Sequence, residues 1–170
     1  MAEMFLKLTD ITGESLDVDH QDEIEVHGWN WGLSNDASFS IRTMREGAPH
    51  TSVQHLTIDK ALDNASVPLT QYCAQGTHIS QGVLVCRKHT GDRADKGRKP
   101  HQDEYLKIEL TDIKVLSVKW PSGRGMEAHV LENVELEFLE FNMTYKMQAQ
   151  EGQLTGARHF HFSLPEQKVK

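Results

Sequence analysis

The sequence has few cysteines and no long apolar run, and both absences narrow what the protein can be. Its 170 residues include two cysteines, Cys73 and Cys86, which form neither a CxxC pair nor a zinc-binding set. We expect buried or half-buried free thiols, while the spacing also permits a disulfide between them. No stretch has the length of a membrane span, and the acid at Glu3 and the early Lys7 do not fit a signal peptide. The sequence therefore predicts no membrane insertion and no use of the general secretory route.

Motifs for catalysis and for nucleotide binding are also missing. The chain has no GxSxG, no P-loop and no GxGxxG. Its formal net charge is −7, and the basic residues between positions 87 and 104 have no aromatic residues among them. We therefore expect no catalytic residues, no cofactor and no nucleic-acid partner.

Ten histidines raise the question of a metal site. His159 and His161 lie two apart, so on a strand they point the same way. A usable site needs a third ligand, and Leu164 and Pro165 occupy the positions where a carboxylate would follow. We expect a pair of sheet-surface histidines and no metal, and a metal-dependent enzyme built on this pair is kept as an alternative.

The acidic residues of one predicted strand alternate with apolar ones. Glu135 and Glu137 flank Leu136, and Glu132 and Glu140 lie further out on the same strand. Two carboxylates on one face can serve glycoside chemistry. The alternation favours a solvated strand face instead.

Short alternating segments dominate the chain and predict a mainly β structure. Strands are expected at residues 4–8, 23–33, 53–59, 79–89, 104–120, 131–147 and 157–164. One helix is expected over residues 64–75, with Ser66 as its N-cap, an apolar face of Leu69, Tyr72 and Cys73, and Gly76 just past its end. The prediction is one all-β domain, residues 1–170, of the barrel or sandwich type, with loops at 34–52 and 90–102 and a loose C-terminal tail.

The two longest predicted strands change the phase of their apolar residues midway. In one, Leu136 and Phe138 share a face and Phe141 takes the opposite phase; in the other, Leu110 and Ile113 differ in the same way. Because strand period is two, the change requires either a bulge or a second apolar environment such as a neighbouring subunit. The pattern alone leaves both explanations open.

Several motifs, in order along nearly the whole chain, resemble one known family. They are Met4-Phe5-Leu6-Lys7-Leu8 with Gly13-Glu14-Ser15; Asp22-Glu23-Ile24-Glu25-Val26-His27-Gly28-Trp29-Asn30-Trp31-Gly32-Leu33; Leu56-Thr57-Ile58-Asp59-Lys60, Asp63 and Ser66-Val67-Pro68-Leu69; Cys73-Ala74-Gln75-Gly76-Thr77-His78; Glu104-Tyr105-Leu106 and Val115-Leu116-Ser117-Val118; and Glu132-Asn133-Val134 with Thr144-Tyr145-Lys146. This ordered set resembles the haemolysin-coregulated protein family, Hcp, the inner-tube protein of type VI secretion.

The resemblance implies a fold, an assembly and a role. The fold would be a two-sheet β-barrel with one short helix, assembled as a homo-hexameric ring. Stacked rings would form a tube that a contractile sheath propels from a bacterium together with a spike. The tube would be secreted from the bacterial cytoplasm without a signal peptide, and small effectors would travel in its lumen.

The resemblance also suggests functional residues. It places the strand around Trp29 and Trp31 on the lumen wall, which makes Gly28, Asn30 and Gly32 candidate effector contacts, whereas we expect the two tryptophans to pack in the core. It likens residues 34–52 to the family's extended loop, which reaches a neighbouring subunit. Its apolar anchors would be Phe39, Ile41 and Met44.

Two other functions remain open. One is a monomeric β-barrel that binds a small ligand in an enclosed apolar pocket. The other is a phage tail-tube protein, whose architecture is related. Native mass separates the monomeric barrel from a ring.

Overall fold

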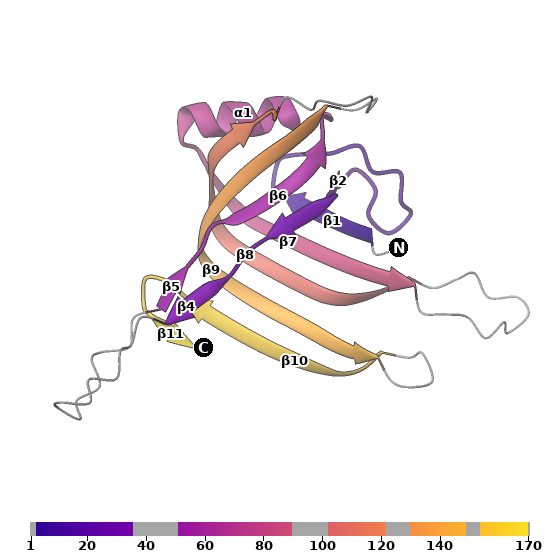
Figure 1. The fold of residues 1–170 in the computed structure, drawn as a ribbon, viewed down its shortest axis with the longest axis vertical. Helices are drawn as coiled ribbons and strands as arrows, with labels where there is room; N and C mark the ends of the chain where they lie inside the picture. The colour runs from indigo at the N-terminus through magenta and orange to yellow at the C-terminus, as the bar shows by residue number, and fades with distance from the viewer. Residues whose placement is uncertain (1–2, 36–50, 90–101, 122–129, 149–153, 170) are drawn as a thin grey trace, which may run out of the picture.

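The structure is a computed structural model that describes residues 3–35, 51–89, 102–121, 130–148 and 154–169 (Figure 1). Its strands are β1 (Glu3–Leu8), β2 (Ile24–Glu25), β3 (Gly28–Asn30), β4 (Leu33–Asn35), β5 (Thr51–Val53), β6 (Leu56–Ala61), β7 (His78–His89), β8 (Gln102–Lys119), β9 (Leu131–Gln148), β10 (Leu154–Ser163) and β11 (Lys168–Val169). The helix α1 spans Ser66–Gln75. The prediction of a mainly β protein with one short helix is confirmed.

Strand β9 organises the main sheet. Along one edge it pairs with β8 for most of its length. Along the other edge its first part pairs with β6 and its last part with β10. The order β11-β10-β9-β8-β7-β1-β2 has two different ends, and β3 joins through β6, so the described sheet is not closed into a full barrel. Strands β4 and β5 form a separate pair.

A single apolar core lies on the inner side of this sheet. Most of its buried side chains come from β1, β2, β6, the helix and the four longest strands, and they include Leu6, Ile24, Leu56, Leu69, Leu84, Ile108, Val134 and Phe141. In Figure 1 the helix lies across the end of the molecule where β6 and β8 finish and β9 begins. Leu69 is fully buried there, and Tyr72 and Cys73 pack against the same core, as the sequence predicts.

The start of the helix differs from the prediction at one residue. Ala65 occupies the cap position and makes no side-chain cap bond, while Ser66 is the first helical residue. The Ser66 hydroxyl turns inward instead, donating to Glu132 and accepting the backbone N–H of Asp63 at 3.1 Å. Gly76 does end the helix in the left-handed conformation, with φ of 65°.

The phase change in the long strands arises from a local backbone kink. Asp112 in β8 has a φ of 55°, a conformation that aspartate tolerates better than most residues. The residues on either side of the kink, Leu110 and Ile113, both enter the core. Opposite them in β9, Phe138 and Phe141 also share that core, with ring centroids 6.1 Å apart. One subunit therefore accounts for both apolar phases.

Two further predicted segments differ in detail. The strand expected over residues 23–33 is divided into β2, β3 and β4, because these pieces pair with three different strands, β1, β6 and β5. The C-terminal tail is not loose as expected: β11 pairs with β10, matching Phe162 with Val169. Most of the predicted loops, residues 36–50 and 90–101, lies outside the described residues.

Candidate functional site

Strand β3 carries two of the predicted effector-contact residues onto a polar sheet face. Its pairing with β6 sets Asn30 opposite Thr57 and Gly28 opposite Asp59. Because directly opposed residues of antiparallel strands point to the same side, these side chains share one face. Asn30 is exposed there. Gly32 lies beyond the end of β3, next to Gln54, so it does not join the same row.

The same face continues across β9 and β8. The register extends the row of Asn30 and Thr57 to Glu135 in β9 and Ser117 in β8. It extends the row of Gly28 and Asp59 to Asn133 and Lys119. The Asn133 amide donates to Asp59 Oδ1 at 2.8 Å, and the Ser117 hydroxyl donates to Glu135 Oε2 at 3.1 Å. The result is an ordered polar surface four strands wide.

Glu135 is the anionic centre of this surface. Its Oε1 lies 2.8 Å from His55 Nδ1. The hydrogen bond from His55, followed by that from Ser117, lowers the pKa of the Glu135 carboxyl below its ordinary range. The carboxylate held by His55 and by Ser117 of the neighbouring strand adds negative charge to this face.

Sequence reasoning identified part of this surface. The sequence points to Gly28 and Asn30 among its candidate effector contacts. It does not reveal that Asn133 and Glu135 lie on the same surface, because β6 and β9 are far apart in the chain. Of the proposed subunit contacts, Phe39, Ile41 and Met44 lie outside the described residues.

The two tryptophans beside Asn30 pack inward, as expected. Trp29 and Trp31 both contact the core. Trp31 makes edge-to-face contacts with Phe138 and Phe141, with centroids 5.9 and 4.7 Å away. This packing anchors the segment that presents Asn30 to solvent.

On the inner face of the main sheet, apolar side chains continue past the edge of the buried core. The register continues from Met4 through Cys86 and Leu106 to Tyr145, so these four side chains form a row next to the core. Cys86 is buried, Met4 and Leu106 are half-buried, and Tyr145 is 41% exposed. Large apolar side chains at the border of a core are a common feature of surfaces that meet another chain.

The acidic residues of β9 have two different environments. Glu135 and Glu137 point to solvent or to surface partners, as predicted. Glu132 does not: it is fully buried, and its Oε2 lies 3.2 Å from Nζ of the equally buried Lys60. The prediction of a solvated face is therefore wrong for Glu132, because it shares the inward strand face of Val134 and Leu136.

His159 and His161 share a sheet face, but each has its own partner. His159 Nδ1 lies 3.0 Å from the Thr144 hydroxyl, and His161 Nε2 lies 3.3 Å from Glu140 Oε2. Within the described ranges, no three histidine, cysteine, aspartate or glutamate side chains are arranged to hold a metal ion.

Both cysteines are free thiols, which agrees with the expectation. Cys86 is buried, and burial raises the pKa of its thiol. In the part of the chain that the structure describes, no helix has the length and apolarity needed to cross a membrane.

Comparison with known proteins adds the decisive observation. The family model described as "Type VI secretion system effector, Hcp" matches residues 5–145. The chain belongs to the Hcp family. The match covers most of β1, the strands from β2 to β8 and most of β9, including the polar face around Asn30.

Individual relatives agree with this membership. Protein Hcp1 of Pseudomonas aeruginosa is 35% identical over 154 residues, covering 91% of this chain and 89% of that protein. The crystal structure of Hcp1 from Salmonella typhimurium superposes with a TM-score of 0.76 at 31% identity, covering 99% of each chain. A structure of a type six secretion system protein reaches a TM-score of 0.88 at 24% identity over the whole of both chains, which supports the fold. The chain is therefore a type VI secretion protein of the Hcp type.

Proposed function

We propose that this protein is the structural subunit of a type VI secretion inner tube. In this proposal it forms homo-hexameric rings that stack, is secreted with the tube, and contacts sheath and spike components. Its role is structural and does not include catalysis. The observation that carries the proposal is the family match over residues 5–145, from β1 into β9.

The uncovered end of the inner sheet side supports a neighbouring subunit as the binding partner. Tyr145 and Met147 are 41% and 44% exposed, although they alternate along β9 on the same strand face as the buried Phe141. Tyr145 also meets the Tyr105 ring edge-to-face, with centroids 6.4 Å apart, so the apolar surface continues onto β8. In an assembled ring a second copy would cover this surface, which is how closed oligomers bury such patches.

The test is native mass, measured by size-exclusion chromatography with light scattering. A hexamer would have six times the chain mass of 19.3 kDa, about 116 kDa. Tyr145→Lys is expected to shift the protein toward the single-chain mass, because a lysine ammonium in a covered apolar contact is costly to desolvate.

Leu139→Lys is the matched control, because Leu139 is also 41% exposed but lies opposite the kink of β8, outside the row of Tyr145. We expect this variant to keep the hexameric mass. A wild-type protein that stays at 19.3 kDa at high concentration would contradict the ring and favour the monomeric ligand-binding barrel.

A further inference from the structure

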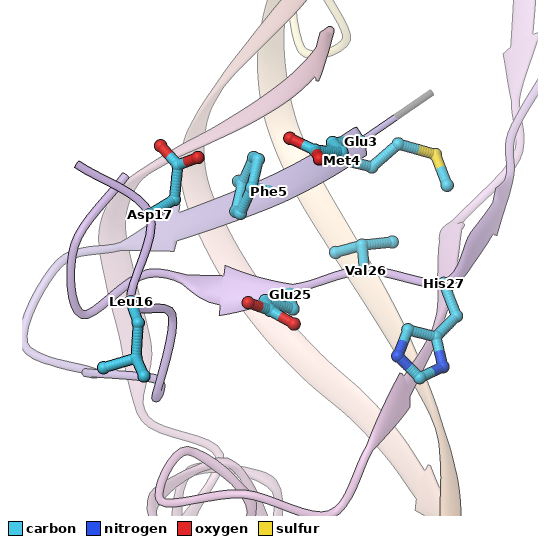
Figure 2. Close-up of a pocket in the computed structure, with 8 residues that line it drawn as sticks. All are labelled: Glu3, Met4, Phe5, Leu16, Asp17, Glu25, Val26 and His27. Atoms are coloured by element: carbon cyan, nitrogen blue, oxygen red, sulfur yellow. The ribbon is translucent and has the colours of Figure 1, made fainter. Parts of the chain in front are cut away.

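A groove opens beside the first two strands, and Met4 is the residue that it shares with the row of Tyr145. It has a volume of about 580 Å³ and is lined by residues of β1, of the loop between β1 and β2, of β2 and of the two positions that follow β2 (Figure 2). The lining residues are Glu3, Met4, Phe5, Leu16, Asp17, Glu25, Val26 and His27. A volume of this size accommodates a few side chains or a short peptide segment.

The floor of the groove is apolar and its rim is acidic. Phe5 and Val26 are almost fully buried beneath it, and Leu16 from the loop forms one wall. Figure 2 shows the carboxylates of Glu3, Asp17 and Glu25 around this floor. Apolar surface with charge at its edge is suited to a ligand that carries both features.

A buried arginine holds the loop that forms the wall. Arg87 is 2% exposed, and its guanidinium donates to Asp17 Oδ1 at 3.1 Å and to Glu3 Oε2 at 2.7 Å. It also lies over the Phe5 ring, 4.7 Å from the centroid. Asp17 points inward to Arg87, and its neighbour Leu16 points to solvent and is 91% exposed.

The three rim carboxylates have different surroundings. Glu3 and Asp17 both form ion pairs with Arg87. The Glu25 carboxylate is exposed and has no hydrogen bond or ion pair with any residue that the structure describes. A cation placed beside Glu25 would meet an unpaired carboxylate next to exposed aliphatic surface.

We propose that this groove binds a basic segment of a partner protein, with a lysine or arginine side chain beside Glu25 and an adjacent apolar side chain against Leu16. Binding of this kind needs one subunit only. It therefore does not depend on whether the chain forms rings, and its test can succeed or fail independently of the native mass.

The test measures the fluorescence anisotropy of a labelled short peptide of alternating leucine and arginine, titrated with the full-length protein. The same peptide with glutamate in place of arginine is the negative probe. We expect the arginine peptide to bind and the glutamate peptide not to bind, and we expect the affinity to fall as salt is raised.

Variants locate the binding. Glu25→Gln is expected to lower the affinity for the arginine peptide by about threefold, in the range of an exposed ion pair. Leu16→Ser is expected to lower that affinity by about tenfold, because it removes an apolar contact. Both side chains are exposed, so neither change should affect folding. The matched controls are Val18→Ser, which removes an equally exposed aliphatic side chain outside the groove, and Glu137→Gln on the exposed side of β9. Both controls should bind as the wild type does.

Three outcomes would overturn the proposal. One is equal binding of the arginine and glutamate peptides. Another is unchanged affinity in both Glu25→Gln and Leu16→Ser. The third is a protein that ignores the peptides while Leu16→Ser alters its native mass, because the groove would then contact another copy of this chain.

Discussion

Lys60 is a charged side chain that this protein buries completely. Its ammonium lies 3.2 Å from Glu132 Oε2, 2.7 Å from Asp63 Oδ1 and 3.1 Å from the Ser66 hydroxyl. It also donates to the carbonyl of Ala61 at 2.8 Å. These contacts join β6, β9 and the start of α1, so one ammonium fixes the position of the helix on the sheet.

Removing the fully buried partner of this lysine should be strongly destabilising. Glu132→Ala is expected to lower the free energy of unfolding by about 3–5 kcal/mol, because it leaves the buried ammonium with Asp63 at the edge of the site as its remaining carboxylate. Urea denaturation followed by circular dichroism measures the loss.

The control for this prediction is Glu135→Ala, which breaks a half-exposed pair with His55 and should change stability by about 1 kcal/mol or less. The double variant Lys60→Met with Glu132→Leu should recover most of the lost stability, since it removes both charges. Equal, small effects of Glu132→Ala and Glu135→Ala would contradict a structural role for the buried pair.

At the scale of elements, the loop between β1 and β2 depends on one anchor. The Asp17 carboxylate accepts hydrogen bonds from Arg87 and from the backbone N–H groups of Asp19 and His20, at 3.0 and 3.2 Å for the last two. The hydrogen bond from Arg87 is the largest influence, and it lowers the pKa of Asp17 below its ordinary 3.8 even though partial burial acts in the opposite direction.

This anchor predicts an acid-dependent contribution to stability. A carboxyl with a lowered folded-state pKa stabilises the protein above its unfolded value of 3.8 and loses that contribution as the pH falls through the folded value. Asp17→Asn should therefore be less stable than the wild type at neutral pH, and the difference should shrink in acid below 3.8. Thermal unfolding over a pH series measures it.

Asp19→Asn is the control, because Asp19 is 75% exposed and lies 3.7 Å from Arg87. Its effect should be smaller at every pH. A constant difference between Asp17→Asn and the wild type across the series would show that the charge of Asp17 is not what holds the loop.

Elements were predictable from the sequence where local patterns decide them. The helix, its buried Leu69 and its terminal Gly76 follow from spacing alone, and most long strands agree to within a few residues. The division of residues 23–33 into three strands was not predictable, because it depends on partners elsewhere in the chain. The same limitation applies to Ser66, whose hydroxyl donates a hydrogen bond to the distant Glu132 instead of capping the helix.

The kink at Asp112 shows what the sequence pattern reveals and what only the structure reveals. The change of apolar phase is visible in the sequence, yet a backbone kink and a neighbouring subunit both explain it. The positive φ of Asp112 decides for the kink. The polar face was likewise visible strand by strand, while its continuity from Asn30 to Glu135 required the register of β6 with β9.

At the scale of the whole molecule, one subunit carries three distinct surfaces. They are the polar face around Asn30, the apolar row that ends at Tyr145, and the acidic groove beside Glu25. We propose that the first faces the lumen of a ring and meets the transported effectors, while the second is covered by the next subunit.

The lumen assignment leads to a prediction about Asn30. Asn30→Gln keeps the polarity but lengthens the side chain, so rings should keep their native mass while retention of co-purifying effectors falls. Quantitative mass spectrometry of purified rings measures the retention. Intact rings that hold every effector as before would remove Asn30 from the contact surface.

The pairing of β6 with β9 also limits the order in which the newly made chain can fold. Lys60 is translated 72 residues before Glu132. At about 5–20 residues per second, the interval between them lasts roughly 4 to 14 seconds. Throughout that time Asp63 is the only one of the two carboxylate partners of the ammonium that has been made, so the buried site around Lys60 is incomplete. The helix can close over the sheet only after the ribosome has delivered the start of β9.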